Sequence, residues 1–212
     1  MSLGRKTPLR RKGWKGSAGD EKGKGNPKDV PHFSIDYSLM TSIFANAIRR
    51  LENPMSPRTG RSLRNDSYYH IIARGHQEQR LFERDSDYQF YLRLLKRYKK
   101  RFPLQIHGFC LLPDHIYIIV KCGIAQQLSS FMQRVNQSYA LYFNGRHRRI
   151  GRLWRGRFQS ILLNENDLWD CLKSVEFSPV RLNIVSSPLD YPWSSCHHRI
   201  LGKSNGILDS VH

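Results

Sequence analysis

Beyond residue 64, apolar positions follow two spacings, one typical of strands and one typical of helices. Strand character marks 67–75, the stretch 104–123, which Pro113-Asp114 divides in two, and the end of 149–163. Helical spacing marks 85–102, 125–147 and 164–182, and Pro179 is expected to halt the last helix near Ser178. The order strand, helix, strand, strand, helix, strand, helix predicts an α+β fold. The ferredoxin-like plan fits it, with helices on one face of a mainly antiparallel sheet.

The first 64 residues have a different composition. Residues 1–33 are basic and contain Gly and Pro, which predicts a disordered tail. Within 34–64, apolar residues recur at helical spacing over 38–52, and a basic linker follows. We therefore expect a basic N-terminal extension, one domain over 65–202, and a short tail over 203–212.

Charge narrows the class of partner. The 212 residues include 35 Lys and Arg but only 17 Asp and Glu, a formal net charge of +18. Such an excess favours nucleic acid first and an anionic membrane surface second. No apolar run is long enough to span a bilayer, and the first residues lack the apolar segment of a secretory signal. The four scattered cysteines predict neither a zinc site nor a disulfide framework, so we expect a reducing, cytoplasmic and nucleoid-associated location.

The densest cationic stretch is 146–157. Arginine forks match phosphate oxygens, and an aromatic ring among them can stack on an unpaired base. Further cations stand next to the predicted strand and near the end of the last helix. The predicted DNA contacts are Arg74, His76, Arg146, Arg148, Arg149, Arg152, Trp154, Arg155, Arg157 and Arg181.

The segment "PDHIYIIV" raises the question of a metal site. In a strand, His115 and Tyr117 point to the same face, as two ligands of a divalent ion would. Tyr139 is a conceivable nucleophile, but it lies on an apolar helical stripe, which favours packing. Ser174 and Ser178 stand one helical turn apart and share a face that borders an apolar stripe. Composition alone favours packing for both serines.

Five segments, taken together, resemble the single-tyrosine HUH transposases of small insertion sequences, and most closely the REP-associated tyrosine transposases. They are "SYYHIIARGHQEQRLF", "IHGFCLLPDHIYIIV", "GRLWRGRF", "FSPVRLNIV" and "DYPWSS", in the order of the family. The similarity runs from about Tyr68 to Leu201. The resemblance implies a ferredoxin-like fold, usually dimeric, that acts on single-stranded DNA carrying hairpins.

The resemblance also implies a chemistry. A His-hydrophobic-His pair holds a divalent ion, Mg²⁺ or Mn²⁺, and a helix tyrosine attacks the phosphodiester to form a 5′-phosphotyrosine. A polar residue one turn later, often Asn or Gln, completes the metal shell. In this chain His115 matches the first histidine, but Tyr117 replaces the second. Ser178 stands at the Asn or Gln position, and Ser174 stands where the tyrosine is expected.

These departures predict a DNA-binding protein of the transposase family with a degenerate catalytic site. A phenol is a poor ligand at neutral pH, and a serine hydroxyl needs an adjacent base to attack. Three alternatives stay open. They are an active enzyme whose rebuilt site uses His115 and Tyr117 for metal and Tyr139 or Ser174 for attack, an RNA-binding module, and a membrane-surface protein that uses 38–52.

Overall fold

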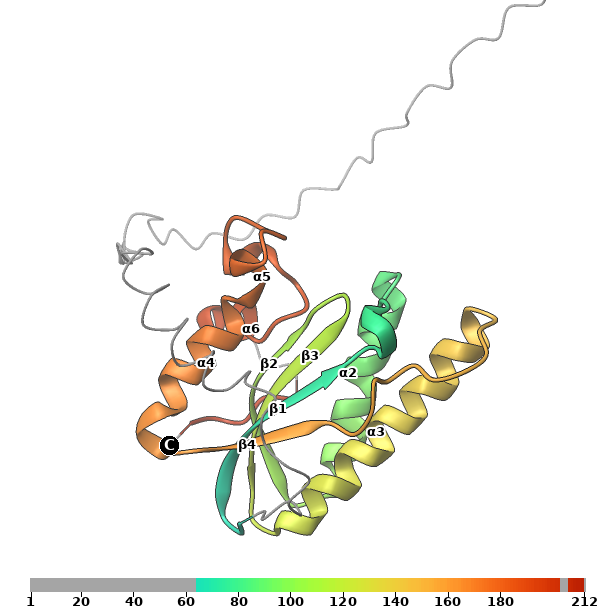
Figure 1. Ribbon diagram of the computed structural model, residues 1–212. Helices are drawn as coiled ribbons and strands as arrows, with labels where there is room; N and C mark the ends of the chain where they lie inside the picture. The colour runs from blue at the N-terminus through green and yellow to red at the C-terminus, as the bar shows by residue number, and fades with distance from the viewer. Residues whose placement is uncertain (1–63, 203–205, 212) are drawn as a thin grey trace, which may run out of the picture. The chain divides into compact units, whose positions relative to one another are not determined.

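A four-stranded antiparallel sheet forms the centre of the protein. The computed structural model describes residues 64–202 and 206–211. Neighbouring strands follow the order β2-β3-β1-β4, so the first and third strands in sequence lie at the centre (Figure 1). The strands are β1 (Ser67–Arg74), β2 (Leu104–Leu111), β3 (His115–Cys122) and β4 (Gln159–Leu163).

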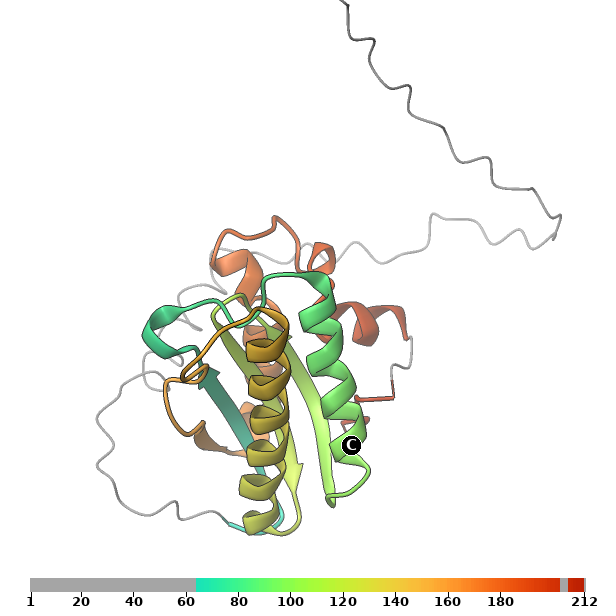
Figure 2. The ribbon, with the colours of Figure 1, turned by 90° about the vertical axis from the view of Figure 1, so that its right-hand side faces the viewer.

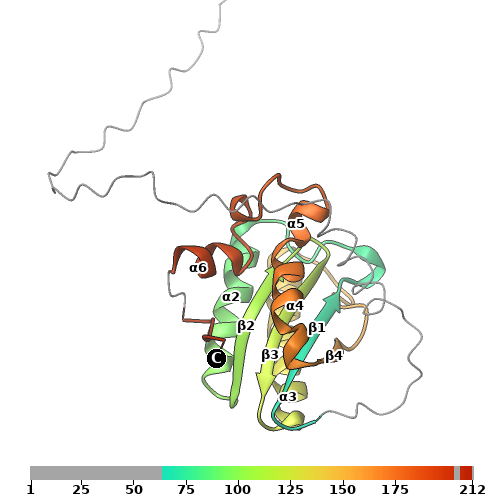
Figure 3. The same cartoon turned by 90° about the vertical axis from the view of Figure 1, so that its left-hand side faces the viewer.

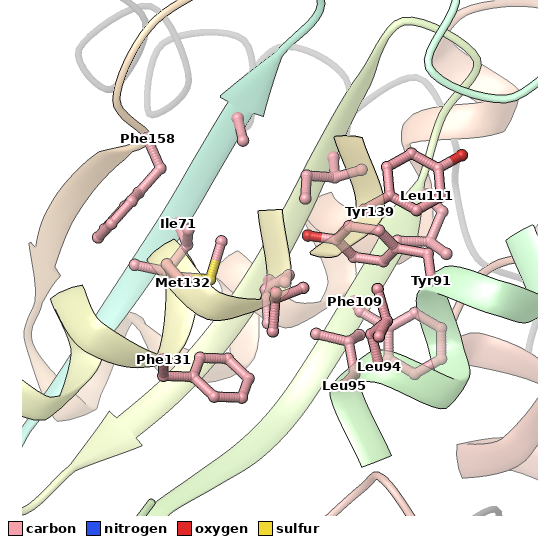
Figure 4. Packing of buried hydrophobic residues seen from close by; sticks show 14 of the residues in the cluster. Ile71, Tyr91, Leu94, Leu95, Phe109, Leu111, Phe131, Met132, Tyr139 and Phe158 are labelled. Atoms are coloured by element: carbon pink, nitrogen blue, oxygen red, sulfur yellow. The ribbon is translucent and has the colours of Figure 1, made fainter. Parts of the chain in front are cut away.

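Two long helices, α2 (Asp85–Lys99) and α3 (Ala125–Arg146), cover one face of the sheet (Figure 2). The apolar stripes of these helices pack against the strands and form a large buried cluster. In it, Leu95, Phe131 and Tyr139 of the helices face Ile71 and Phe109 of the sheet (Figure 4). The alternation of side chains along each strand sends every second residue into this cluster. The predicted α+β fold and its helical stripes are therefore confirmed.

The third helix of the prediction lies on the other face. It forms α4 (Leu168–Glu176) and, after a break at Phe177, the single turn α5 (Ser178–Arg181). Leu172 and Val175 pack on the opposite side chains of the sheet in a second cluster, so the expectation that all helices share one face holds only for α2 and α3 (Figure 3). Both faces of the central strands are apolar, and an uncovered second face would expose that surface to water.

Close approach of α4 to the sheet depends on Gly108 in β2. The register between β2 and β3 shifts between Ile106 and Gly108, and a Cβ atom at Gly108 would stand 2.5 Å from Cδ2 of Leu172. A short C-terminal helix, α6 (Cys196–Leu201), follows. The remaining elements are the 3₁₀ turns η1 (His76–Glu78), η2 (Glu165–Asp167) and η3 (Pro188–Asp190).

The predicted disordered tail and the amphipathic helix at 38–52 lie outside the described residues. Within 64–202 and 206–211, no helix combines the length and the apolar character needed to cross a membrane.

Candidate functional site

His115 opens β3 at the end of the sheet where β1 stops. It stands opposite Arg74 in the antiparallel register of these two strands. Its Nδ1 lies 2.7 Å from Oδ1 of Asp114, and this hydrogen bond holds the pKa of the Asp114 carboxyl below its usual range. The carboxylate fixes the orientation of the imidazole ring, as carboxylates do for histidines that bind metal ions.

Tyr117 lies on the same face as His115, under α4. Its ring centroid is 4.9 Å from that of His115 and 5.2 Å from that of His70 on β1. The residue is buried in the second apolar cluster, where its ring fills space between the sheet and the helix. The position at which the resemblance predicts a second histidine thus holds a side chain that packs.

The two serines meet at the junction of α4 and α5. Oγ of Ser178 donates to the main-chain oxygen of Ser174 over 3.0 Å, the usual back-bond of a helical serine. Arg181 closes the group: its Nη1 lies 3.3 Å from Oγ of Ser174, and its Nη2 lies 3.2 Å from Oγ of Ser178. Both hydroxyls therefore accept hydrogen bonds from one guanidinium.

The side chains at the four predicted positions do not suit the coordination of a divalent ion. Mg²⁺ and Mn²⁺ favour carboxylate, carbonyl and water oxygens, whereas this group offers one imidazole, a buried phenol and two hydroxyls bound to a cation. Among the residues that the structure describes, no group of three or more His, Cys, Asp and Glu side chains could hold a metal ion. A guanidinium in hydrogen-bond contact with two of the expected positions also repels a second cation.

His70 belongs to the same face, and the sequence reasoning missed it. It is buried on β1, and within the described part of the chain neither ring nitrogen has a hydrogen-bond partner. Burial and, to a smaller extent, the charge of Arg181 lower the pKa of His70 to about 4. The one signal in the sequence is the alternation Tyr68, His70, Ile72, which puts all three side chains on one face.

Tyr139, the alternative nucleophile, lies on the opposite face of the sheet. It belongs to the cluster under α2 and α3, and its hydroxyl donates to the main-chain oxygen of Leu81 over 2.5 Å. Burial raises the pKa of this phenol above its ordinary value, so deprotonation is unfavourable. The structure does not bring Tyr139 together with His115, Ser174 or Ser178.

The basic loop, residues 146–157, is fixed to the turn that follows β1. The amide of His76 donates to the oxygen of Leu153 over 2.9 Å, and the amide of Arg155 donates to the oxygen of Arg74 over 2.9 Å. The side chain of Gln79 donates to the oxygens of Arg152 and Leu153. The loop therefore stands at the same end of the sheet as His115. Its exposed arginines are Arg146, Arg148, Arg152, Arg155 and Arg157, and Arg149 is half-buried, donating to Gln79.

The two aromatic residues of this stretch pack toward the core, one completely and one in part. Phe158 is buried in the large core cluster. Trp154 packs beside Tyr91 and Tyr139, with its Nε1 donating to the oxygen of Asn136 over 2.9 Å. Trp154 is half-buried, so its packing uses part of the ring, and the prediction that it contacts DNA stays a prediction. Its indole holds the loop in place.

Comparisons with known proteins agree with this fold. Residues 64–168 match the family described as IS200-like transposases. A protein of Haemophilus influenzae, provisionally named a REP-associated tyrosine transposase, is 23% identical over 112 residues, which cover 48% of this chain and 64% of that relative. The chain thus spans less than two thirds of the length of that curated protein. A solved structure, described as a REP-associated tyrosine transposase bound to a REP hairpin, superposes with a TM-score of 0.60 at 18% identity, covering 74% of this chain and 93% of the other.

Proposed function

Because this chain belongs to the IS200-like transposase family, we propose that it is a DNA-binding member that has lost strand cleavage. Its ligand is single-stranded DNA that carries hairpins, and it acts without a bound divalent ion. Support for the ligand comes from the hairpin DNA held by the structural relative and from the net charge of +18.

One observation carries the loss of cleavage, namely the hydrogen bonds from Arg181 to Ser174 and Ser178. The family's nucleophile position holds the hydroxyl of Ser174, and its side-chain hydrogen-bond partner among the described residues is a cationic donor and not a base. The position of the family's Asn or Gln metal ligand holds the hydroxyl of Ser178, which accepts a hydrogen bond from the same guanidinium. Without an ion, several kcal/mol of transition-state charge stabilisation are missing.

The DNA-binding surface is retained by contrast. Arg74, at the end of β1, stands opposite His115, and the basic loop is hydrogen-bonded to the same turn. Figure 1 shows α5 at this end of the sheet too, beside the turn between β2 and β3. A phosphate backbone laid across this end meets arginines from three separate segments, which gives affinity without base-specific contacts.

The test uses the purified full chain and a hairpin-bearing single strand. We expect binding that weakens steeply with salt, about 10³–10⁵-fold between 50 and 200 mM if 6–10 phosphates are neutralised. We expect no covalent adduct on a denaturing gel with Mg²⁺ or Mn²⁺. A metal-dependent adduct would defeat the proposal, and mass spectrometry of the adduct would show whether Tyr139 or Ser174 attacks.

Two further experiments test the RNA-binding alternative and the oligomeric state. Tighter binding of an RNA hairpin than of the DNA hairpin of the same sequence would favour an RNA-binding module. The family resemblance also supports a homodimer, and light scattering coupled to size-exclusion chromatography measures it directly. A mass of one chain, with DNA present and absent, would overturn the dimer and leave the DNA-binding proposal standing.

A further inference from the structure

A second cationic surface lies on the side of the sheet that α2 and α3 cover. Arg93 and Arg97 are exposed on α2, and Lys100 and Arg101 are exposed in the turn that follows it. Residues three or four apart share one side of a helix, so these four cations form a single row, the α2 stripe. Eight residues of helix span about 12 Å. The DNA contacts predicted from the sequence include none of the four.

Tyr98 holds two guanidiniums of the α2 stripe in place. The Cζ atoms of Arg97 and Arg101 lie 5.9 Å and 6.0 Å from the centroid of its ring. Its hydroxyl lies 2.9 Å from Oγ of Ser138 on α3, so the ring itself is anchored. A guanidinium that rests on an aromatic face keeps the N–H groups at its edge for an oxygen acceptor.

Arg93 is held in the same way, one helical turn before Arg97. Its Cζ lies 5.4 Å from the ring centroid of Phe90, and Phe90 stacks on Tyr142 of α3 with 3.7 Å between the ring centroids. Side chains that are already ordered lose less conformational entropy on binding than mobile ones do. The α2 stripe is therefore a preformed row of donors.

The positive charge of the α2 stripe is not neutralised by neighbouring carboxylates. In the part of the chain that the structure describes, its four cations form no ion pair with Asp or Glu. The neighbouring Lys99 differs, because its Nζ lies 2.7 Å from Oδ1 of Asp209. A row of cations without counter-charges creates a positive potential that attracts a polyanion.

Helix α3 extends this surface. It contains no Asp or Glu, and Arg134 is exposed on it. Phe131 of α3 contacts the ring of Phe102, which follows the α2 stripe, and Ser138 contacts Tyr98. Arg134 lies three residues after Phe131 and four before Ser138, so it stands on the side of α3 that is turned toward α2.

The α2 stripe and the basic loop belong to opposite ends of the sheet (Figure 2). Leu104, which begins β2 after the turn that ends α2, is the register partner of Cys122 at the end of β3. His115 opens β3 at the other end, where the basic loop is fixed. A strand of eight residues is about 23 Å long. The two cationic surfaces are therefore separate.

We propose that the α2 stripe binds the phosphate backbone of a duplex DNA segment, so that the protein bridges this segment to the hairpin-bearing strand. The inference rests on the proposed function, which assigns that strand to the other end of the sheet. A row of about 12 Å covers about three or four phosphates of one strand of a duplex. Arginine and lysine contacts to phosphate carry no sequence information, so the second segment is bound without regard to its sequence.

The test captures one DNA on another. A hairpin-bearing single strand is fixed to beads, saturated with the full chain, washed, and exposed to a labelled duplex of unrelated sequence at about 50 mM salt. We expect the wild-type protein to retain the duplex. Arg97→Gln with Arg101→Gln should retain at least about tenfold less, because two charge-assisted contacts are lost, while its binding to the hairpin strand is unchanged.

Lys121→Gln with Lys173→Gln is the matched control. It removes the same net charge from two cations that already face carboxylates, Asp66 at 3.6 Å and Asp170 at 3.9 Å, and we expect it to capture the duplex as the wild type does. Far-UV circular dichroism checks that both double variants are folded.

Two results would overturn the bridging role of the α2 stripe. Capture that survives in the α2 variant would assign the second contact to another part of the chain or to a second copy. An equal loss in the lysine control would make net charge, and not this surface, responsible. Failure of the proposed function gives a different result, since the beads would then retain no protein at all.

Discussion

Nε2 of His147 lies 3.1 Å from Oδ2 of Asp87, a carboxylate with no exposed surface. The other ring nitrogen lies 3.1 Å from Oε2 of Glu83. Asp87 also accepts from the main-chain amides of Glu83 and Arg84, each over 3.0 Å. One carboxylate thus ties the start of α2 to His147, the residue that follows α3 and belongs to the basic loop.

Replacement of this carboxylate will destabilise the fold. Asp87→Asn keeps the size but loses the charge that its donors share, so we expect the free energy of unfolding to fall by about 2–3 kcal/mol. Urea denaturation measures the loss. Asp170→Asn is the matched control, because the Asp170 side chain is 65% exposed. Its ion pair with Lys173 is long, at 3.9 Å. A loss above about 1 kcal/mol in the control would contradict the role of burial.

Gly108→Ala will displace α4. The added methyl group would meet Cδ2 of Leu172 at 2.5 Å, and we expect a loss of about 1–3 kcal/mol in the free energy of unfolding. Gly145→Ala in α3 provides the comparison, since a Cβ there meets no atom within 4 Å. Alanine in a helix favours folding by up to about 1 kcal/mol over glycine, so the two variants should change stability in opposite directions.

The neutral, buried His70 makes stability depend on pH. Its pKa falls from 6.5 in the unfolded chain to about 4 in the fold, so between these values only the unfolded chain takes up the proton. The contribution of His70 to the free energy of unfolding is fully present above pH 6.5 and is lost as the pH falls toward 4. Between pH 7.5 and pH 5 the loss is on the order of 2 kcal/mol.

His70→Gln should remove this part of the pH dependence, measured as the difference in unfolding free energy between pH 7.5 and pH 5. His76→Gln, at a half-buried position in η1, should retain it. An unchanged difference in the His70 variant would show that other groups account for the slope.

The basic loop should contribute to affinity without selecting a sequence. Arg152→Gln with Arg155→Gln removes two exposed cations, and we expect the slope of log affinity against log salt to fall by about one for each phosphate that these arginines neutralise. The decrease should be the same for hairpins of different sequence. Unequal decreases would point instead to base recognition by one of these arginines.

Metal binding should return with the residues of the family pattern. Tyr117→His supplies a second imidazole on the strand face of His115, and Ser178→Asn supplies the amide oxygen that the family pattern has at this position. We expect this double variant to bind Mn²⁺ at least about tenfold more tightly than Ser178→Asn alone, a difference of about 1.4 kcal/mol. The decrease of the free Mn²⁺ signal in electron paramagnetic resonance reports binding. Equal affinities would mean that the geometry, and not only the donor set, has changed.

Much of the fold could be predicted from the sequence because periodicity is a local property. The stripe of α3 through Leu128, Phe131, Val135 and Tyr139 is buried as predicted, and Pro113-Asp114 does separate β2 from β3. The face on which α4 packs could not be predicted. An amphipathic helix shows which of its sides is apolar, but the side of the sheet it covers depends on the path of the chain.

The roles in the candidate site were predictable only where the family pattern names a position. Spacing alone paired His115 with Tyr117 and Ser174 with Ser178, and the family pattern suggested their roles. The structure places His115 and Tyr117 on one face of the sheet and joins the two serines at the end of α4. Arg181 was assigned to DNA, and Pro179 predicts the end of the helix near Ser178, but the bonds of Arg181 to both serines depend on the path of the chain through α5, which residue spacing does not predict. The inward packing of Trp154 was equally hidden, since its neighbours in sequence are exposed arginines.

The two faces of the sheet differ in the residues that they carry. The α2 and α3 side holds the larger apolar cluster, whereas Tyr117 packs on the other side and Ser174 and Ser178 lie in α4 and α5. Substitution at those positions leaves the larger apolar cluster intact. A protein built this way can change the residues of its candidate site one at a time and keep its fold.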